Sequence, residues 1–112
     1  MNDDIAKERL EPPEPEPVVL GDIRYEALMW GKARDLGQNG GYIEAFKVST
    51  GESLWVLKIY DIVYDDDMEQ DKQDIFIEEM RAVDSGHLLI LDEHGRRYKV
   101  DVRDMSVDEM KN

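Results

Sequence analysis

The feature that most constrains the fold is an alternation of apolar and polar residues in short segments, separated by glycines and other turn-forming residues. A side-chain period of two is typical of β-strands, because successive side chains point to opposite faces of a sheet. Helical periodicity is hard to find in the same segments. We therefore expect a mainly β fold, a small antiparallel sheet that forms a partly open barrel or sandwich of about five to seven strands with little helix.

The alternation predicts strands over residues 18–30, 42–48, 53–64, 74–83, 87–92 and 97–102. Within the third of these, residues 53–63 are the predicted core strand, because apolar residues occupy both faces. Residues 49–52 and 93–96 are predicted turns, and residues 68–73 are predicted to be helical or turn-like. Ser106 and Glu109 have the spacing of a capping box, which predicts a helical turn at the end of the chain.

Proline is confined to one segment, since residues 11–17 hold all four prolines, interleaved with glutamates. Proline lacks a backbone donor and the neighbouring carboxylates repel one another, so this segment favours an extended, solvated chain. We expect residues 1–17 to be a disordered acidic and proline-rich linker, residues 18–104 a single β-domain and residues 105–112 a frayed tail.

The first ten residues lack the apolar run of a secretory signal, and charges interrupt every apolar run before the ~18 residues that a membrane helix needs. The chain contains no cysteine, which excludes disulfides, thiolate metal sites and thiol catalysis. We expect a cytoplasmic protein without membrane insertion. The alternative is an exported protein whose signal has been removed, because proline-rich linkers also tether domains to anchors.

Acidic residues outnumber basic ones by 27 to 14, which gives a formal net charge of −13. Residues 61–80 alone contain nine acidic residues and one lysine. Such a field favours cations, basic partners or simple solubility. Nucleic-acid binding is disfavoured, because phosphate contacts need a clustered basic face.

Four acidic residues of this stretch stand at alternate positions: Asp65, Asp67, Glu69 and Asp71. The opening ligands of an EF-hand calcium loop have the same spacing. The rest of that pattern fails, because Gln70 stands where the loop needs glycine and Phe76 where it needs glutamate. The interpretations are weak divalent-cation binding by these carboxylates or a solvated charged loop.

Two histidines, His87 and His94, flank one predicted strand, with Asp84, Asp92 and Glu93 near them in sequence. These groups are of the kind that form an acid–base pair or a metal site. No nucleophile, oxyanion-binding loop or third ligand accompanies them, so we expect exposed histidines without a chemical role.

Glycines cluster in residues 37–41, next to the cations Lys32 and Arg34. A phosphate-binding loop would continue with Gly-Lys-Ser/Thr, which is missing here. We expect the glycines to provide positive backbone angles in a connection.

Residues 41–55 contain an Ala-aromatic pair at Ala45-Phe46, a Thr50-Gly51 turn and a strand that begins Leu54-Trp55. This segment resembles one hairpin of a PQQ-type β-propeller repeat. A propeller needs several blades of about 40 residues each, and the motif occurs once in this chain. The resemblance therefore implies a hairpin, and the family's cofactor is not carried over. A turn that any β protein would favour is the other interpretation.

The sequence favours a non-catalytic small β-domain that mediates protein–protein interaction or self-association, with no cofactor. The predicted interaction residues are two aromatics and two cations: Trp30, Tyr42, Arg97 and Lys99. The two cations share one strand face, and there are two interpretations of them: pairing with the acidic stretch of a neighbouring subunit, or a solvated outer sheet face of mixed charge. The alternative is a ligand- or divalent-cation-binding domain that uses residues 61–79.

Overall fold

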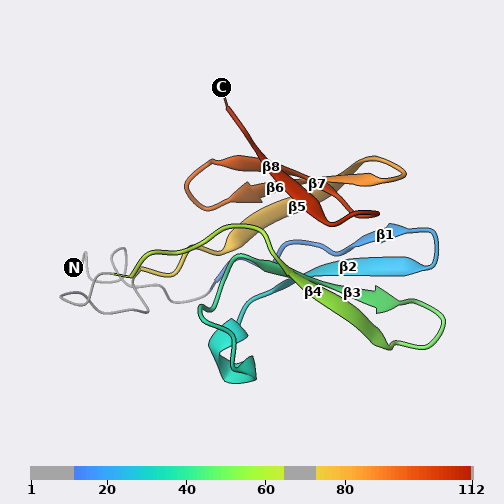
Figure 1. Ribbon diagram of the computed structural model, residues 1–112, viewed down its shortest axis with the longest axis horizontal. Helices are drawn as coiled ribbons and strands as arrows, with labels where there is room; N and C mark the ends of the chain where they lie inside the picture. The colour runs from blue at the N-terminus through green and yellow to red at the C-terminus, as the bar shows by residue number, and fades with distance from the viewer. Residues whose placement is uncertain (1–11, 65–72, 112) are drawn as a thin grey trace, which may run out of the picture.

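The computed structural model describes residues 12–64 and 73–111, which form two four-stranded antiparallel sheets. The strand order is β1-β2-β3-β4 in sheet A and β5-β6-β7-β8 in sheet B, so every strand pairs with its neighbours in the chain. In Figure 1, sheet B (yellow to red) lies over sheet A (blue to green). The elements are β1 (Val18–Leu20), β2 (Ile23–Leu28), the 3-10 helix η1 (Gly31–Arg34), β3 (Tyr42–Lys47), β4 (Ser53–Lys58), β5 (Ile77–Asp84), β6 (His87–Asp92), β7 (Arg97–Asp101) and β8 (Ser106–Met110).

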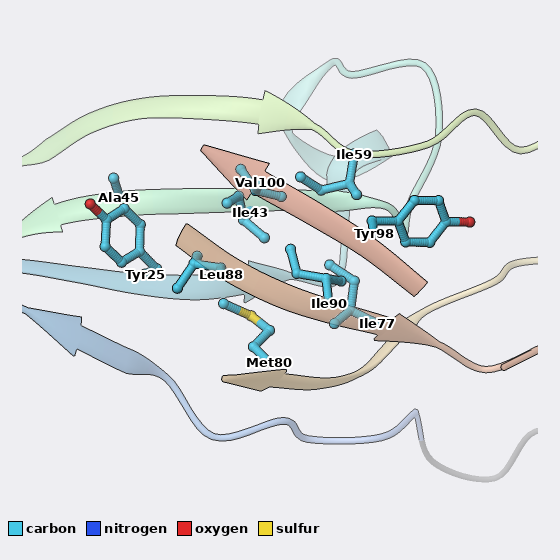
Figure 2. Close-up of a cluster of buried hydrophobic side chains, with 10 residues drawn as sticks. All are labelled: Tyr25, Ile43, Ala45, Ile59, Ile77, Met80, Leu88, Ile90, Tyr98 and Val100. Atoms are coloured by element: carbon cyan, nitrogen blue, oxygen red, sulfur yellow. The ribbon is translucent and has the colours of Figure 1, made fainter. Parts of the chain in front are cut away.

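The mainly β prediction is confirmed, with a sandwich-like arrangement of eight strands in place of the expected five to seven. Side chains from the facing surfaces of the two sheets fill the space between them (Figure 2). Burial alternates along β6 and β7, as the sequence alternation requires. Among the described residues, no helix is long and apolar enough to cross a membrane.

The last predicted hairpin is confirmed, because β6 pairs with β7 from His87 opposite Asp101 to Leu91 opposite Arg97. The predicted turn at residues 49–52 is also present, between β3 and β4. Gly51 adopts φ 76° and Gly95 φ 82° in these turns, a backbone region that favours glycine.

The single strand predicted for residues 18–30 is wrong, because the chain reverses after Leu20 and forms the β1–β2 hairpin. Gly21 has φ 63°, which breaks the strand without a steric cost. Val18 consequently lies opposite Tyr25 in the neighbouring strand.

The predicted core strand over residues 53–63 is also wrong, because β4 ends at Lys58 and lies at the edge of sheet A. The chain beyond it still buries Ile59 and Ile62. The buried Gln38 side chain forms hydrogen bonds with the backbone of this segment, as a neighbouring strand would. Its amide nitrogen donates to the Tyr60 carbonyl and its oxygen accepts from the Ile62 amide, both at 2.8 Å.

The strand predicted for residues 74–83 is present as β5, although it begins at Ile77. Of the helical or turn-like stretch predicted for residues 68–73, only Gln73 lies within the described residues, in a turn. The helical turn and frayed tail expected after residue 104 are wrong. Ser106–Met110 forms β8, which pairs with β7 along its whole length.

Candidate functional site

The four edge strands of the two sheets differ in how exposed they are to a partner strand. β1 has three residues, and β5 and β8 carry exposed acidic side chains: Glu78, Glu79, Asp84, Asp108 and Glu109. β4 has six residues, Ser-Leu-Trp-Val-Leu-Lys, without one acidic side chain. Short or charged edge strands resist pairing with other chains, whereas an apolar edge of this length invites it. The free side of β4 is therefore the strongest candidate site.

The register of β3 and β4 shows which backbone groups point to the free side. The Ile59 amide donates to the Gly41 carbonyl at 2.6 Å, and Leu57 lies opposite Ile43 in the same register. Alternate residues of an antiparallel strand direct their backbone groups to the same neighbour. Residues 55, 57 and 59 therefore face β3, whereas Val56 and Lys58 direct their amide and carbonyl groups away from it. No strand among the described residues pairs with that side.

The side chains along β4 are mostly apolar and partly accessible. Leu54 is 41% exposed, and it lies at an irregularity of the β3–β4 register between Trp55 and Ser53. Trp55 and Leu57 are half-buried and pack against the core, while Val56 is half-buried on the opposite face of the sheet. An added strand would therefore meet apolar side chains on both faces.

The first residue of β4 is fixed to sheet A by a buried carboxylate, Glu44 of β3. Arg34 of η1 donates to both carboxylate oxygens, at 2.7 and 3.0 Å, and the Ser53 hydroxyl donates to one of them at 2.6 Å. The Arg34 hydrogen bonds hold the pKa of Glu44 below its usual value. This network orders the start of β4.

Each end of β4 carries an exposed acidic residue. Glu52 precedes the strand, and its backbone amide donates a hydrogen bond to the Thr50 hydroxyl at 3.2 Å. Asp61 follows the strand with a side chain that is 78% exposed, and it contacts the Lys58 ammonium at 2.8 Å. That hydrogen bond raises the pKa of Lys58. The one cation of β4 is thus neutralised by its own neighbour.

The two predicted histidines do not meet, because they lie at opposite ends of β6. The His87 ring lies between two carboxylates, with Nδ1 at 2.7 Å from Asp84 and Nε2 at 3.4 Å from Asp101. Both ring nitrogens are thereby directed to carboxylates on different sides of the ring, which is not the convergent geometry of a metal site. Within the described ranges, no group of three or more ligand-type side chains is arranged for a metal ion.

Asp92, which lies near the histidines in sequence, has a structural role. Its side chain is 1% exposed and accepts hydrogen bonds from the Tyr98 hydroxyl and from the amides of His94 and Arg96. Glu93 accepts a hydrogen bond from the Phe76 amide at 2.9 Å. Both acidic residues thus accept hydrogen bonds from backbone amides at the end of sheet B.

The structure does not gather the four predicted interaction residues. Trp30 is 52% exposed and lies edge-on to the Phe76 ring, with ring centroids 5.4 Å apart. Tyr42 is buried, because its ring packs under Gly31, where an added Cβ would lie 2.7 Å from it. Arg97 and Lys99 belong to β7 in the other sheet, opposite Leu91 and Leu89 of β6.

The predicted cation ligands Asp65, Asp67, Glu69 and Asp71 lie outside the described residues. The chain on either side of them is held together by polar contacts. The Tyr64 hydroxyl and the Asn39 side-chain amide donate to different oxygens of the buried Asp74, at 2.5 and 3.0 Å. Burial, together with the Asp74 hydrogen bond, raises the pKa of Tyr64 to about 12.

The glycine-rich segment serves close packing. An added Cβ at Gly40 would lie 2.4 Å from the Ile75 carbonyl oxygen, and Gly41 adopts φ 89°. The ammonium of Lys32 lies 4.3 Å from the centre of the Tyr64 ring, and Arg34 binds Glu44. Both cations therefore contact other side chains, Tyr64 and Glu44, and do not form a phosphate-binding site with the glycine-rich segment.

Neither the comparison with protein-family models nor the comparison with curated proteins found a match to this chain. Sequence reasoning missed the β4 edge because it placed that strand in the centre of the sheet. The signal that marks it is the absence of acidic residues from 53–58 in a chain that contains 27 of them.

Proposed function

We propose that this protein is a non-catalytic binding domain that accepts an extended segment of another protein, or of a second copy, along the free side of β4. The observation that carries the proposal is the combination of outward-directed backbone groups at Val56 and Lys58 with an edge strand that lacks acidic side chains. In strand addition, main-chain hydrogen bonds supply affinity and the alternate side chains supply specificity.

A proline at position 56 tests this function directly. The Val56 amide faces away from β3, so Val56→Pro removes a donor from the free side and leaves the β3–β4 ladder intact. The matched control is Val56→Thr, which keeps the amide and a β-branched side chain. Near-UV circular dichroism of both variants checks that the fold is retained.

Sedimentation velocity over a range of protein concentrations measures self-association, and an array of random extended heptapeptides measures capture of a foreign strand. We expect the wild-type chain and Val56→Thr to associate in at least one assay, and Val56→Pro to lose that association. Undiminished association of a folded Val56→Pro protein would show that β4 is not the binding edge.

A further inference from the structure

We infer that the segment that adds to β4 is a basic strand of a different protein, with apolar residues at its centre and lysine or arginine at its ends. This inference rests on the proposed function and specifies its partner. It follows from the charges around the edge and from the pattern of side chains along it.

The charges at the ends of β4 favour a basic partner. Glu52 is exposed before the strand, and Asp61 is 78% exposed after it. Lys58 contacts Asp61, so this pair leaves the second end without net charge of either sign. Because Glu52 lies at one end of β4, a segment with cations at both ends places one of them beside it in parallel and in antiparallel orientation.

The charge of the whole chain disfavours a second copy as the occupant. Each copy carries a formal net charge of −13. Two such molecules repel one another over the distance of the Debye length, whereas a basic segment is attracted and steered to the edge.

The centre of the partner strand is specified by the apolar side chains of β4. Trp55 and Leu57 lie on the core face, Val56 is half-buried on the opposite face, and Leu54 is 41% exposed. Cross-strand neighbours stabilise a sheet when β-branched and aromatic side chains meet. The matching segment therefore has valine- or threonine-like residues at its centre.

Two capped peptides test the inference: Lys-Thr-Val-Thr-Val-Thr-Lys and its acidic counterpart Glu-Thr-Val-Thr-Val-Thr-Glu. Titration of each into the full chain, followed by amide NMR, gives affinity and location. We expect the basic peptide to bind about tenfold more tightly at low salt, and the difference to shrink near 1 M salt, where the Debye length is roughly 3 Å. Val56→Pro should abolish binding of the basic peptide.

Charge variants separate a local effect from the field of the whole molecule. Glu52→Lys should weaken binding of the basic peptide several-fold, because it removes the acid at one end of β4. Glu78→Lys makes the same change in net charge on β5, an edge strand of the other sheet, and should leave the affinity nearly unchanged. Equal losses in the two variants would overturn the local charge match.

The remaining outcomes distinguish this inference from the proposed function. Equal binding of both peptides, abolished by Val56→Pro, would keep strand addition and overturn the basic partner. Self-association that Val56→Pro abolishes, without binding of either peptide, would assign the edge to a second copy and overturn the basic partner. Absence of both binding and self-association would overturn the inference and the proposed function together.

Discussion

At the scale of single residues, the buried carboxylate of Asp92 has a large expected effect on stability. It is 1% exposed and accepts hydrogen bonds from Tyr98, His94 and Arg96. Asp92→Ala would leave a buried hydroxyl and two turn amides without their acceptor. We expect a loss of about 3 kcal/mol in the free energy of unfolding, since an unpaired buried polar group costs roughly 1–3 kcal/mol. Urea unfolding measures it.

Two conservative variants identify the cause of that loss. Asp92→Asn keeps the oxygen that the two turn amides use, so it should cost less than Asp92→Ala. Tyr98→Phe removes only the hydroxyl that reaches Asp92 at 2.9 Å, and should cost about 1 kcal/mol. A loss for Asp92→Asn as large as that for Asp92→Ala would mean that charge, and not the acceptor, holds the turn.

At the scale of elements, substitutions in β8 test whether the end of the chain contributes to the stability of the sandwich. Val107 lies opposite Val100 and packs, half-buried, against the core. Val107→Ala should lower the free energy of unfolding by about 1 kcal/mol, because it removes two partly buried methyl groups. Asp108→Ala, at the exposed neighbouring position, should change it by less than about 0.5 kcal/mol. Equal effects would indicate a frayed tail.

The elements also show why part of the fold was predictable from sequence. Alternation identified β6 and β7, because each buries one face and leaves the other more accessible. The same signal failed for residues 59–64, where Ile59 and Ile62 are buried outside any strand and the Gln38 side chain satisfies the backbone. Such tertiary contacts leave no periodic pattern in the sequence.

The candidate site was less predictable than the strands. Of the two predicted aromatic interaction residues, Trp30 is 52% exposed, whereas Tyr42 is buried under Gly31, a close approach that the sequence spacing does not reveal. The free side of β4 depends on strand order, which local residue patterns do not specify. Composition nevertheless marked the strand, because its six residues contain no acid.

At the scale of the whole molecule, stability at low pH depends on two opposing effects of the carboxylates. Hydrogen bonds hold the pKa of three of them below its usual value. The bonds come chiefly from the Arg34 side chain to Glu44, from the Gly86 amide to Asp84 and from the Arg103 amide to Asp101. Protonation also reduces the net charge of −13 and thereby the repulsion within the molecule.

The lowered pKa values give a definite sign to the first effect. A carboxyl whose pKa is lower in the folded chain stabilises it fully above the unfolded value, about 3.9 for Asp and 4.3 for Glu, and loses this contribution as the pH falls further. We expect stability to change little from pH 7 to 5 and to fall steeply below about pH 4. Thermal unfolding in about 0.5 M salt isolates this loss, because screening weakens the repulsion between exposed charges.

Glu44→Gln should flatten the acid limb of that curve, since Glu44 is the most buried of the three carboxylates. Stability that rises steadily below pH 4 in high salt would contradict the stabilising hydrogen bonds at these carboxylates.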